Sequence, residues 1–347
     1  MPSPMQALGE VVVFLLLSAM AIVESIVRWL TPSKYKMKSV AGEIALVTGG
    51  GSGLGRLVSL KLAELGAIVV VWDINAKGLN ETLEMIKQAG GTCHGYVCDL
   101  CDREDVYRKA AVLNKEVGRV SILVNNAGIV VAKRFLETPD NMLVKTMEVN
   151  VISHFWTVKA FLPAMLKANK GHIVSIASVA GHVGCPKLVD YTASKFAAVG
   201  FDEALRVELE TDGYNNIKTT AICPYFIRST GMFDSVMARM AGLLEFRYIP
   251  TLTPEEVANR VIEAMRCNER IAFIPGYFKA LIIARMLFPW KCSTMLMNGL
   301  VSDVSPPLDL SNTMTPKIEN LNGKELTNGT AVHQQLARRV SNSERKP

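Results

Sequence analysis

The chain of 347 residues carries a formal net charge of +6, and 49% of its residues are hydrophobic. Its basic residues flank apolar segments and do not form a stripe, which favours contact with anionic lipids and argues against a nucleic-acid-binding protein. The seven cysteines are scattered without the spacing of a disulfide framework, which argues against a disulfide-stabilised scaffold and for a reducing compartment.

An apolar segment near the N-terminus is the first predicted element. Residues 11–23 carry no charge, and 7–30 would span a bilayer if Glu24 and Arg28 reach its interface. We therefore expect a membrane anchor with a basic linker over residues 1–35, either spanning or monotopic. A cleaved signal peptide, which would lack its usual basic start, and a buried core helix are the alternatives. Basic residues follow the apolar run, so the rest of the chain is expected to face the cytosol.

From Gly42 to residue 275 the pattern alternates between strands and helices. Apolar β-branched runs indicate buried parallel strands at 43–48, 67–72, 120–124, 172–177 and 217–223, with a weaker strand at 92–97. Helical stretches lie at 53–65, 76–89, 102–117 and 190–210. This alternation predicts the α/β class, with a single Rossmann-type doubly wound parallel sheet in a three-layer α/β/α domain over residues 42–275.

Three C-terminal segments follow a different pattern. Residues 231–250 are rich in methionine and leucine, which suits either a lid over a ligand or packing against the edge of the sheet. Residues 276–300 are apolar but carry three cations and Pro289, so they are expected to form an amphipathic lid or a membrane-contacting segment. Residues 301–347 are polar and without periodicity, which predicts a disordered tail.

The first strand runs into a glycine-rich turn, Thr48-Gly49-Gly50-Gly51-Ser52-Gly53-Leu54-Gly55, and a helix follows. Such a turn lets the backbone approach a pyrophosphate at the start of that helix. Asp73 ends the second strand, where its carboxylate would accept hydrogen bonds from ribose hydroxyls and repel a 2′-phosphate. No cation lies between Gly49 and Gly55, so NAD is predicted as the cofactor, with NADP less favoured. Alternatively, Asp73 caps the helix at 74–89.

Tyr191 and Lys195 are one helical turn apart, on the same face of a predicted helix. Tyrosine titrates near pH 10, and an ammonium beside it would lower its pKa and make it a usable acid/base for proton transfer to or from an alcohol. Ser178, after the fifth strand, would hydrogen-bond the reacting oxygen. Each residue also has an ordinary alternative: a solvated Tyr–Lys pair, a cap at Ser178, or an Asn150 that satisfies backbone groups.

These motifs, in this order, resemble the short-chain dehydrogenase/reductase family. The resemblance rests on the TGxxxGxG spacing, Cys98-Asp99-Leu100, Asn125-Asn126-Ala127-Gly128, Asn150, Ser178, Tyr191-Thr192-Ala193-Ser194-Lys195 and Pro224. It implies that Asn150, Ser178, Tyr191 and Lys195 are catalytic, with Asn150 fixing a water that links Lys195 to solvent and Lys195 also holding the nicotinamide ribose.

The same resemblance implies a set of cofactor contacts along the strand ends. One residue more than usual lies between Pro224 and Thr230, so Ser229 is expected to replace the family's threonine. The full expected set is Gly49, Ser52, Gly53, Leu54, Gly55, Asp73, Ile74, Cys98, Asp99, Leu100, Asn126, Ala127, Gly128, Tyr191, Lys195, Pro224, Ile227 and Ser229. We expect no metal, because Cys98 and Cys101 lack a second pair and the histidines are not spaced as ligands.

Within that family, the N-terminal anchor and the stretches around His154–Pro163 and Cys223–Phe233 resemble a membrane-associated branch. This branch holds retinol dehydrogenases, epidermal retinal dehydrogenases and 17-beta-hydroxysteroid dehydrogenases of the endoplasmic reticulum and lipid droplets. It implies a lipophilic alcohol or aldehyde substrate, retinol-like or alternatively a hydroxysteroid, in contact with Ser178, Met232 and Phe233. It also implies a homodimer through helices 102–165 and 190–210, and a cytosol-facing catalytic domain on the endoplasmic reticulum membrane or a lipid droplet.

A catalytically silent membrane or lipid-droplet scaffold is the alternative from another class of protein. The presence of all four expected catalytic residues, Asn150, Ser178, Tyr191 and Lys195, argues against it.

Overall fold

The computed structural model describes residues 3–228, 244–246, 251–289, 291–292, 295 and 301–303. The predictions that concern Ser229, Met232 and Phe233, nearly all of the lid at 231–250, and the tail after Asp303 lie outside these residues.

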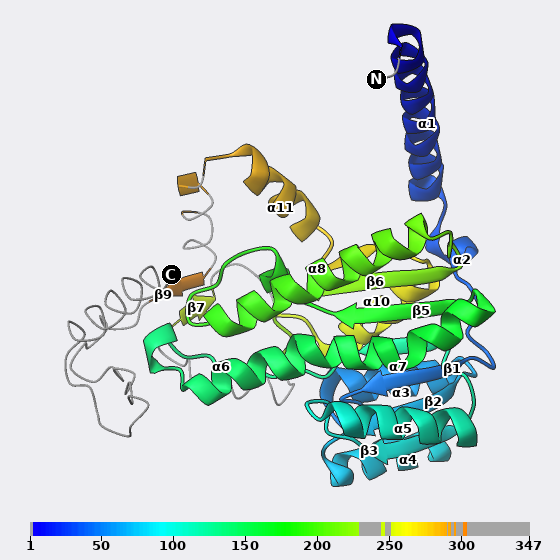
Figure 1. The fold of residues 1–347 in the computed structure, drawn as a ribbon. Coiled ribbons are helices and arrows are strands. Elements are labelled where there is room, and N and C mark those ends of the chain that lie inside the picture. Colours follow the sequence, from blue (N-terminus) through cyan, green and yellow to red (C-terminus); the bar gives the residue numbers. More distant parts are fainter. Residues whose placement is uncertain are drawn as a thin grey trace, which may run out of the picture. The chain divides into compact units, whose positions relative to one another are not determined.

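Seven parallel strands form the central sheet, in the order β3-β2-β1-β4-β5-β6-β8 (Figure 1). They are β1 (Ile44–Thr48), β2 (Ile68–Asp73), β3 (Cys93–Val97), β4 (Ile122–Asn125), β5 (Gly171–Ile176), β6 (Ile217–Pro224) and β8 (Ile271–Ile274). The strand order reverses between β1 and β4, and ligands of open parallel sheets bind at the carboxyl ends of the strands at such a reversal. The predicted doubly wound fold and its six strands are confirmed. A small antiparallel pair, β7 (Leu244–Phe246) with β9 (Val301–Asp303), is separate from this sheet.

The helices of the core alternate with the strands. They are α3 (Gly53–Glu64), α4 (Ala76–Gln88), α5 (Arg103–Glu116), α6 (Asp140–Met147), α7 (Ser153–Ala168), α8 (Val189–Thr211), α10 (Pro254–Arg266) and α11 (Phe278–Leu287). Short 3-10 turns lie at Phe135–Glu137 and Val179–Gly181, and a π-helical turn, η2, covers Glu148–Ile152. Helix α10 and strand β8 are not among the predicted elements, although the capping box of Thr253 and Glu256 marks the start of α10.

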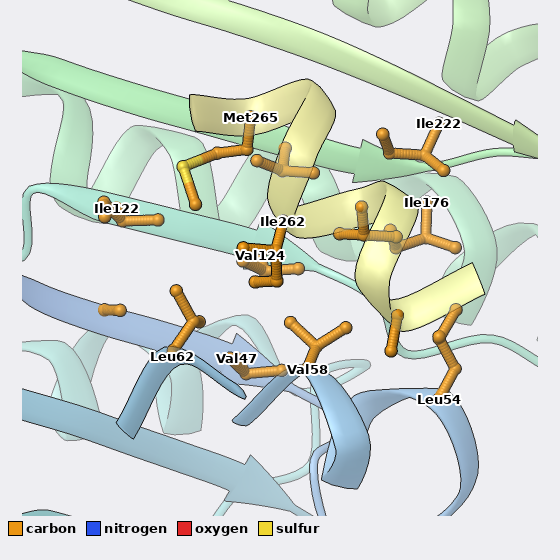
Figure 2. Close-up of a cluster of buried hydrophobic side chains, with 14 of the residues drawn as sticks. Val47, Leu54, Val58, Leu62, Ile122, Val124, Ile176, Ile222, Ile262 and Met265 are labelled. Atoms are coloured by element: carbon orange, nitrogen blue, oxygen red, sulfur yellow. The ribbon is translucent and has the colours of Figure 1, made fainter. Parts of the chain in front are cut away.

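Two hydrophobic layers hold the helices to the sheet. On one face, Val58 and Leu62 of α3 and Ile262 and Met265 of α10 pack over the apolar side chains of the strands, as Figure 2 shows. On the other face, α5, α7 and α8 bury residues such as Leu113, Phe161 and Leu209. Because both faces of the strands are covered, the strands are apolar runs without alternation.

The N-terminal helix α1 (Pro4–Leu30) differs from the core helices. Its window Leu8–Val27 has 20 residues and a mean hydropathy of 2.3, and none of it is buried against the rest of the chain. The interpretation of this segment as a buried core helix is therefore wrong. Twenty helical residues extend about 30 Å, the thickness of a bilayer's hydrocarbon core.

The linker after α1, which includes the short helix α2 (Ser33–Lys36), is fastened to the amino end of the sheet. The Lys38 ammonium lies 2.6 Å from Nδ1 of buried His172, at the start of β5, and Nε2 of His172 lies 2.8 Å from Thr220 Oγ1. Arg266 of α10 also exchanges backbone and side-chain hydrogen bonds with Lys38. From Lys38 onward, the linker is therefore part of the packed domain.

Candidate active site

The glycine-rich turn lies between β1 and α3, at the carboxyl edge of the sheet. Gly49 and Gly53 have φ angles of +63° and +50°, a conformation that side chains disfavour. A Cβ atom at Gly55 would collide with the carbonyl of Gly49. Ser52 precedes α3 without capping it through its side chain, so the first N–H groups of the helix can meet an anion. The turn therefore fits the pyrophosphate of a dinucleotide.

Asn126, after β4, supports this turn. Its side-chain amide donates hydrogen bonds to the carbonyls of Thr48 (2.9 Å) and Gly49 (3.1 Å). The Thr48 hydroxyl in turn accepts from the backbone N–H groups of Asn126 and Ala127. Thr48 was absent from the predicted site residues, yet it joins the two loops between which a dinucleotide would lie. The sequence signal that could have identified Thr48 is its position as the last residue of β1, directly before the glycine-rich turn.

Asp73, at the end of β2, faces the glycine-rich turn. Its carboxylate accepts one hydrogen bond from the Gly51 N–H and another from the Asn75 N–H, each at 2.8 Å. The alternative that Asp73 caps the next helix is wrong, because Asn75 is the N-cap of α4. A carboxylate offers about four acceptor positions, so two remain for ribose hydroxyls. Ile74 beside it is 65% exposed.

Cys98, Asp99 and Leu100 follow β3 next to Asp73. The Cys98 N–H donates to the Asp73 carbonyl at 3.1 Å, and Cys98 and Leu100 are buried. Burial raises the pKa of the Cys98 thiol to about 12. The described residues hold no group of side chains suited to a metal ion, so within them the CxxC pair has no further ligands.

Ser178, Tyr191 and Lys195 meet at the carboxyl end of β5, as their spacing predicts. Ser178 follows β5 and makes a side-chain hydrogen bond with Tyr191. Its hydroxyl also lies 3.3 Å from the carbonyl of Pro224, the last residue of β6. The Lys195 ammonium is 5.5 Å from the centre of the Tyr191 ring. The serine, the phenol and the ammonium thus come together from β5 and α8.

The ionisation of this group is dominated by burial. Burial raises the pKa of Tyr191 to about 12, and the hydrogen bond with Ser178 opposes that rise. Burial also lowers the pKa of Lys195 to about 8. Lys195 donates to the carbonyl of Ile176 at 2.8 Å. The lowering of the phenol's pKa by this ammonium stays a prediction.

Asn150 lies in the π-helical turn η2 and is fully buried. Its side chain binds both backbone groups of Ile129, at 2.8 and 3.0 Å, and donates to Ser194 Oγ at 2.9 Å. Ser194 donates to the carbonyl of Tyr191 at 2.7 Å. Asn150 therefore joins the loop after β4 to the helix that carries Tyr191, and the water-binding role implied by the resemblance stays a prediction.

Tyr191 packs against a small apolar cluster formed by buried Ala132 and Leu188. Half-buried Val130, Cys185 and Phe226 pack against the same cluster. These five residues were not predicted, since they come from three loops whose sequences carry no common motif. Of the remaining predicted contacts, Pro224 ends β6 and Ile227 pairs with Leu252 in a single β-bridge.

Comparison with known proteins agrees with this geometry. The family model described as short chain dehydrogenase matches residues 43–241. Epidermal retinol dehydrogenase 2 of Homo sapiens is 42% identical over 85% of this chain and 94% of its own length. Estradiol 17-beta-dehydrogenase 11 of Rattus norvegicus is 42% identical over 82% and 92%. A short chain dehydrogenase/reductase from Burkholderia phymatum, solved in complex with NAD, has a TM-score of 0.64 and 28% identity, covering 79% of this chain and 100% of its own.

Proposed function

Because the chain belongs to the short-chain dehydrogenase family and is thus an oxidoreductase with a nicotinamide cofactor, we propose that it interconverts a lipophilic alcohol, retinol or a similar long apolar alcohol, with its aldehyde. The observation that carries this proposal is the apolar cluster around Tyr191. A polar hydroxy acid or sugar would leave its remaining hydroxyls unpaired against Val130, Ala132 and Leu188, which is costly. A long hydrocarbon gains free energy there.

In the proposed reaction, Tyr191 accepts the proton of the substrate hydroxyl during oxidation and returns it during reduction. Ser178 hydrogen-bonds the same oxygen and holds it beside the phenol. Lys195 carries a positive charge at neutral pH and favours the phenolate once its ammonium turns from Ile176 toward the phenol. The bound nicotinamide supplies the chemistry that the side chains lack, which is to accept or give the hydride. During these steps Asn150 holds the loop that follows β4 in place against helix α8.

We also propose NAD as the cofactor. Asp73 supports this choice, because its carboxylate lies at the end of β2 with two acceptor positions left for the ribose. Arg56, a cation next to the glycine-rich turn, is already engaged with the Gly51 carbonyl at 2.5 Å and with Glu81 at 2.8 Å. It is therefore poorly placed to offset the repulsion between Asp73 and a 2′-phosphate.

The proposed cellular setting is the cytosolic face of the endoplasmic reticulum or of lipid droplets, with α1 as the anchor. Support comes from the apolar, unburied surface of α1 and the cations that follow it. The segment 276–300 is proposed as a second lipid contact, since Ile283, Met286 and Leu287 of α11 are 54%, 81% and 78% exposed. A homodimer through α7 and α8 is supported by exposed Phe155 and Phe196 on these helices.

A hydroxysteroid is the second candidate substrate, supported by the equal identity to the estradiol dehydrogenase. The deciding experiment incubates detergent-solubilised protein with NAD and, in turn, retinol, estradiol and a hydrophilic polyol, and follows NADH. We expect turnover of retinol and none of the polyol. Turnover of estradiol alone would favour the second candidate, and turnover of the polyol alone would contradict the proposal. Absence of all turnover in protein that binds NADH would favour a silent scaffold.

A further inference from the structure

The Tyr225 phenol is a buried polar group without a hydrogen-bond partner in the part of the chain that the structure describes. Buried hydroxyl groups are nearly always hydrogen-bonded in native proteins, because leaving one unpaired is costly. A phenylalanine would fill the same volume without this cost. The hydroxyl therefore calls for an explanation.

Two ring contacts fix the direction of the Tyr225 side chain. It stacks on Phe278 of α11, with centroids 5.0 Å apart and planes inclined by 23°. Phe226 meets it edge-on at 4.9 Å. Tyr225 also packs against both the cluster under α10 and the cluster around Cys223 and Phe278. A ring held on several sides cannot turn its hydroxyl freely toward a partner elsewhere.

This fixed phenol lies beside the candidate active site. Tyr225 directly follows Pro224, whose carbonyl is near the Ser178 hydroxyl at 3.3 Å. Cys185 connects the two phenols, because it packs in the same apolar cluster as Tyr191 and also in the cluster that includes Tyr225. The Cys185 thiol does not satisfy the Tyr225 hydroxyl, which has no hydrogen-bond partner among the described residues, and the thiol donates to the carbonyl of Val183.

We propose that the Tyr225 hydroxyl donates a hydrogen bond to an oxygen of the bound ligand, and so helps to select that ligand. The proposal rests on the proposed function. Two oxygens share the required chemistry: the carbonyl of the nicotinamide carboxamide, and a second oxygen of a substrate such as a steroid diol. Because burial keeps the phenol neutral, it serves as a donor to either.

The test is Tyr225→Phe, with Tyr277→Phe as the matched control, because Tyr277 is the neighbouring tyrosine and is 49% exposed. Three quantities are measured on the full-length protein: the melting temperature without ligand, the Kd of NADH alone, and KM for retinol and for estradiol. Without ligand, Tyr225→Phe should melt no lower than the wild type, since no bond inside the protein is lost.

With ligands, one neutral hydrogen bond corresponds to about a three- to tenfold change in affinity. A rise of that size in the Kd of NADH assigns the bond to the carboxamide. An unchanged Kd with a raised KM for estradiol, but not for retinol, assigns it to the substrate. Tyr277→Phe should change none of these values.

Two results would overturn the proposal. If Tyr225→Phe leaves Kd and both KM values within twofold, the phenol has no ligand partner. If it lowers the melting temperature without ligand, the phenol is bonded within the protein. The NADH titration needs no turnover, so its result stands apart from whether the proposed alcohol oxidation is observed.

Discussion

At the scale of single residues, the chemistry depends on how burial shifts ionisation around Tyr191 and on how Asp73 is held. Burial raises the pKa of the phenol to about 12, so a phenolate at neutral pH requires positive charge nearby. Lys195 is the one cation on the same face of α8 one turn away, and its pKa of about 8 leaves it mostly charged at pH 7. Asp73 is oriented before any ligand binds, through two backbone N–H groups.

Tyr191→Phe is expected to reduce turnover by about a thousandfold or more while cofactor affinity changes less than about threefold. The ring keeps its packing, and only the oxygen that moves the proton is lost. Turnover and NADH titration check this expectation. Lys195→Ala should impair both properties, since one ammonium is assigned to the phenol and to the cofactor ribose. Near-normal turnover of Tyr191→Phe would show that the acid/base is another group.

Asp73→Ser is expected to weaken NAD binding and strengthen NADP binding. The wild type should prefer NAD about a hundredfold, because a phosphate dianion beside this carboxylate costs about 2–3 kcal/mol after solvent screening. Adding Ile74→Arg, at an exposed position, should turn the preference toward NADP. The Kd of each cofactor is the measurement. Equal use of NAD and NADP by the wild type would mean that Asp73 does not contact the ribose.

At the scale of elements, polar side chains join the sheet to α8, the helix that carries Tyr191 and Lys195. Asp202 of α8 is 1% exposed and accepts from Thr219 of β6 at 2.9 Å, with Arg206 one turn away at 3.5 Å. Burial raises the pKa of Asp202 to about 6, while Thr219, Ser175 and Arg206 oppose the rise and Glu203 adds to it. This interface is therefore sensitive to pH.

The sign of this dependence follows from linkage. The folded pKa of Asp202 lies above its unfolded value of 3.8, so its stabilising contribution is complete below about pH 4 and is lost as pH rises through 6. Asp202→Asn imitates the protonated form and removes that loss. The difference in unfolding free energy between variant and wild type should grow by about 2–3 kcal/mol from pH 4 to 7. Chemical denaturation at several pH values tests this, with Glu208→Gln, at an exposed position of the same helix, as a control whose difference from the wild type should not change with pH.

At the scale of the whole molecule, an apolar helix and a Rossmann-type domain are joined by a short, fastened linker. Seven residues, Thr31 to Met37, separate the end of α1 from Lys38, which is bound to His172 and Arg266. Seven residues span at most about 25 Å even when fully extended. The domain is therefore held close to whatever surface α1 enters.

Full-length protein is expected to remain with membranes after carbonate extraction, and protease added to intact microsomes should digest the catalytic domain. Deleting residues 1–32 keeps the Lys38 contacts and should leave the domain folded. Part of this variant should still float with anionic vesicles through α11, and replacing Ile283, Met286 and Leu287 with serine should release it. A glycosylated Asn80, an exposed residue that begins an Asn-Glu-Thr sequence, would show the opposite orientation.

The sequence alone determined the features that depend on local pattern. Apolar β-branched runs, together with the weaker pattern at 92–97, predicted six of the seven strands of the sheet, and β8 was not assigned. The glycine-rich turn and the spacing of Ser178, Tyr191 and Lys195 located the candidate site, because each motif needs only its neighbours along the chain to be recognisable.

Only the tertiary structure decided the contacts between distant segments. It showed that Asn75 and not Asp73 caps α4, that Lys195 binds Ile176, and that Lys38 reaches His172, 134 residues away. It also oriented the Tyr225 phenol through Phe278. Such contacts depend on which side chains the packed layers bring together, and the periodicity of the sequence does not predict these pairs.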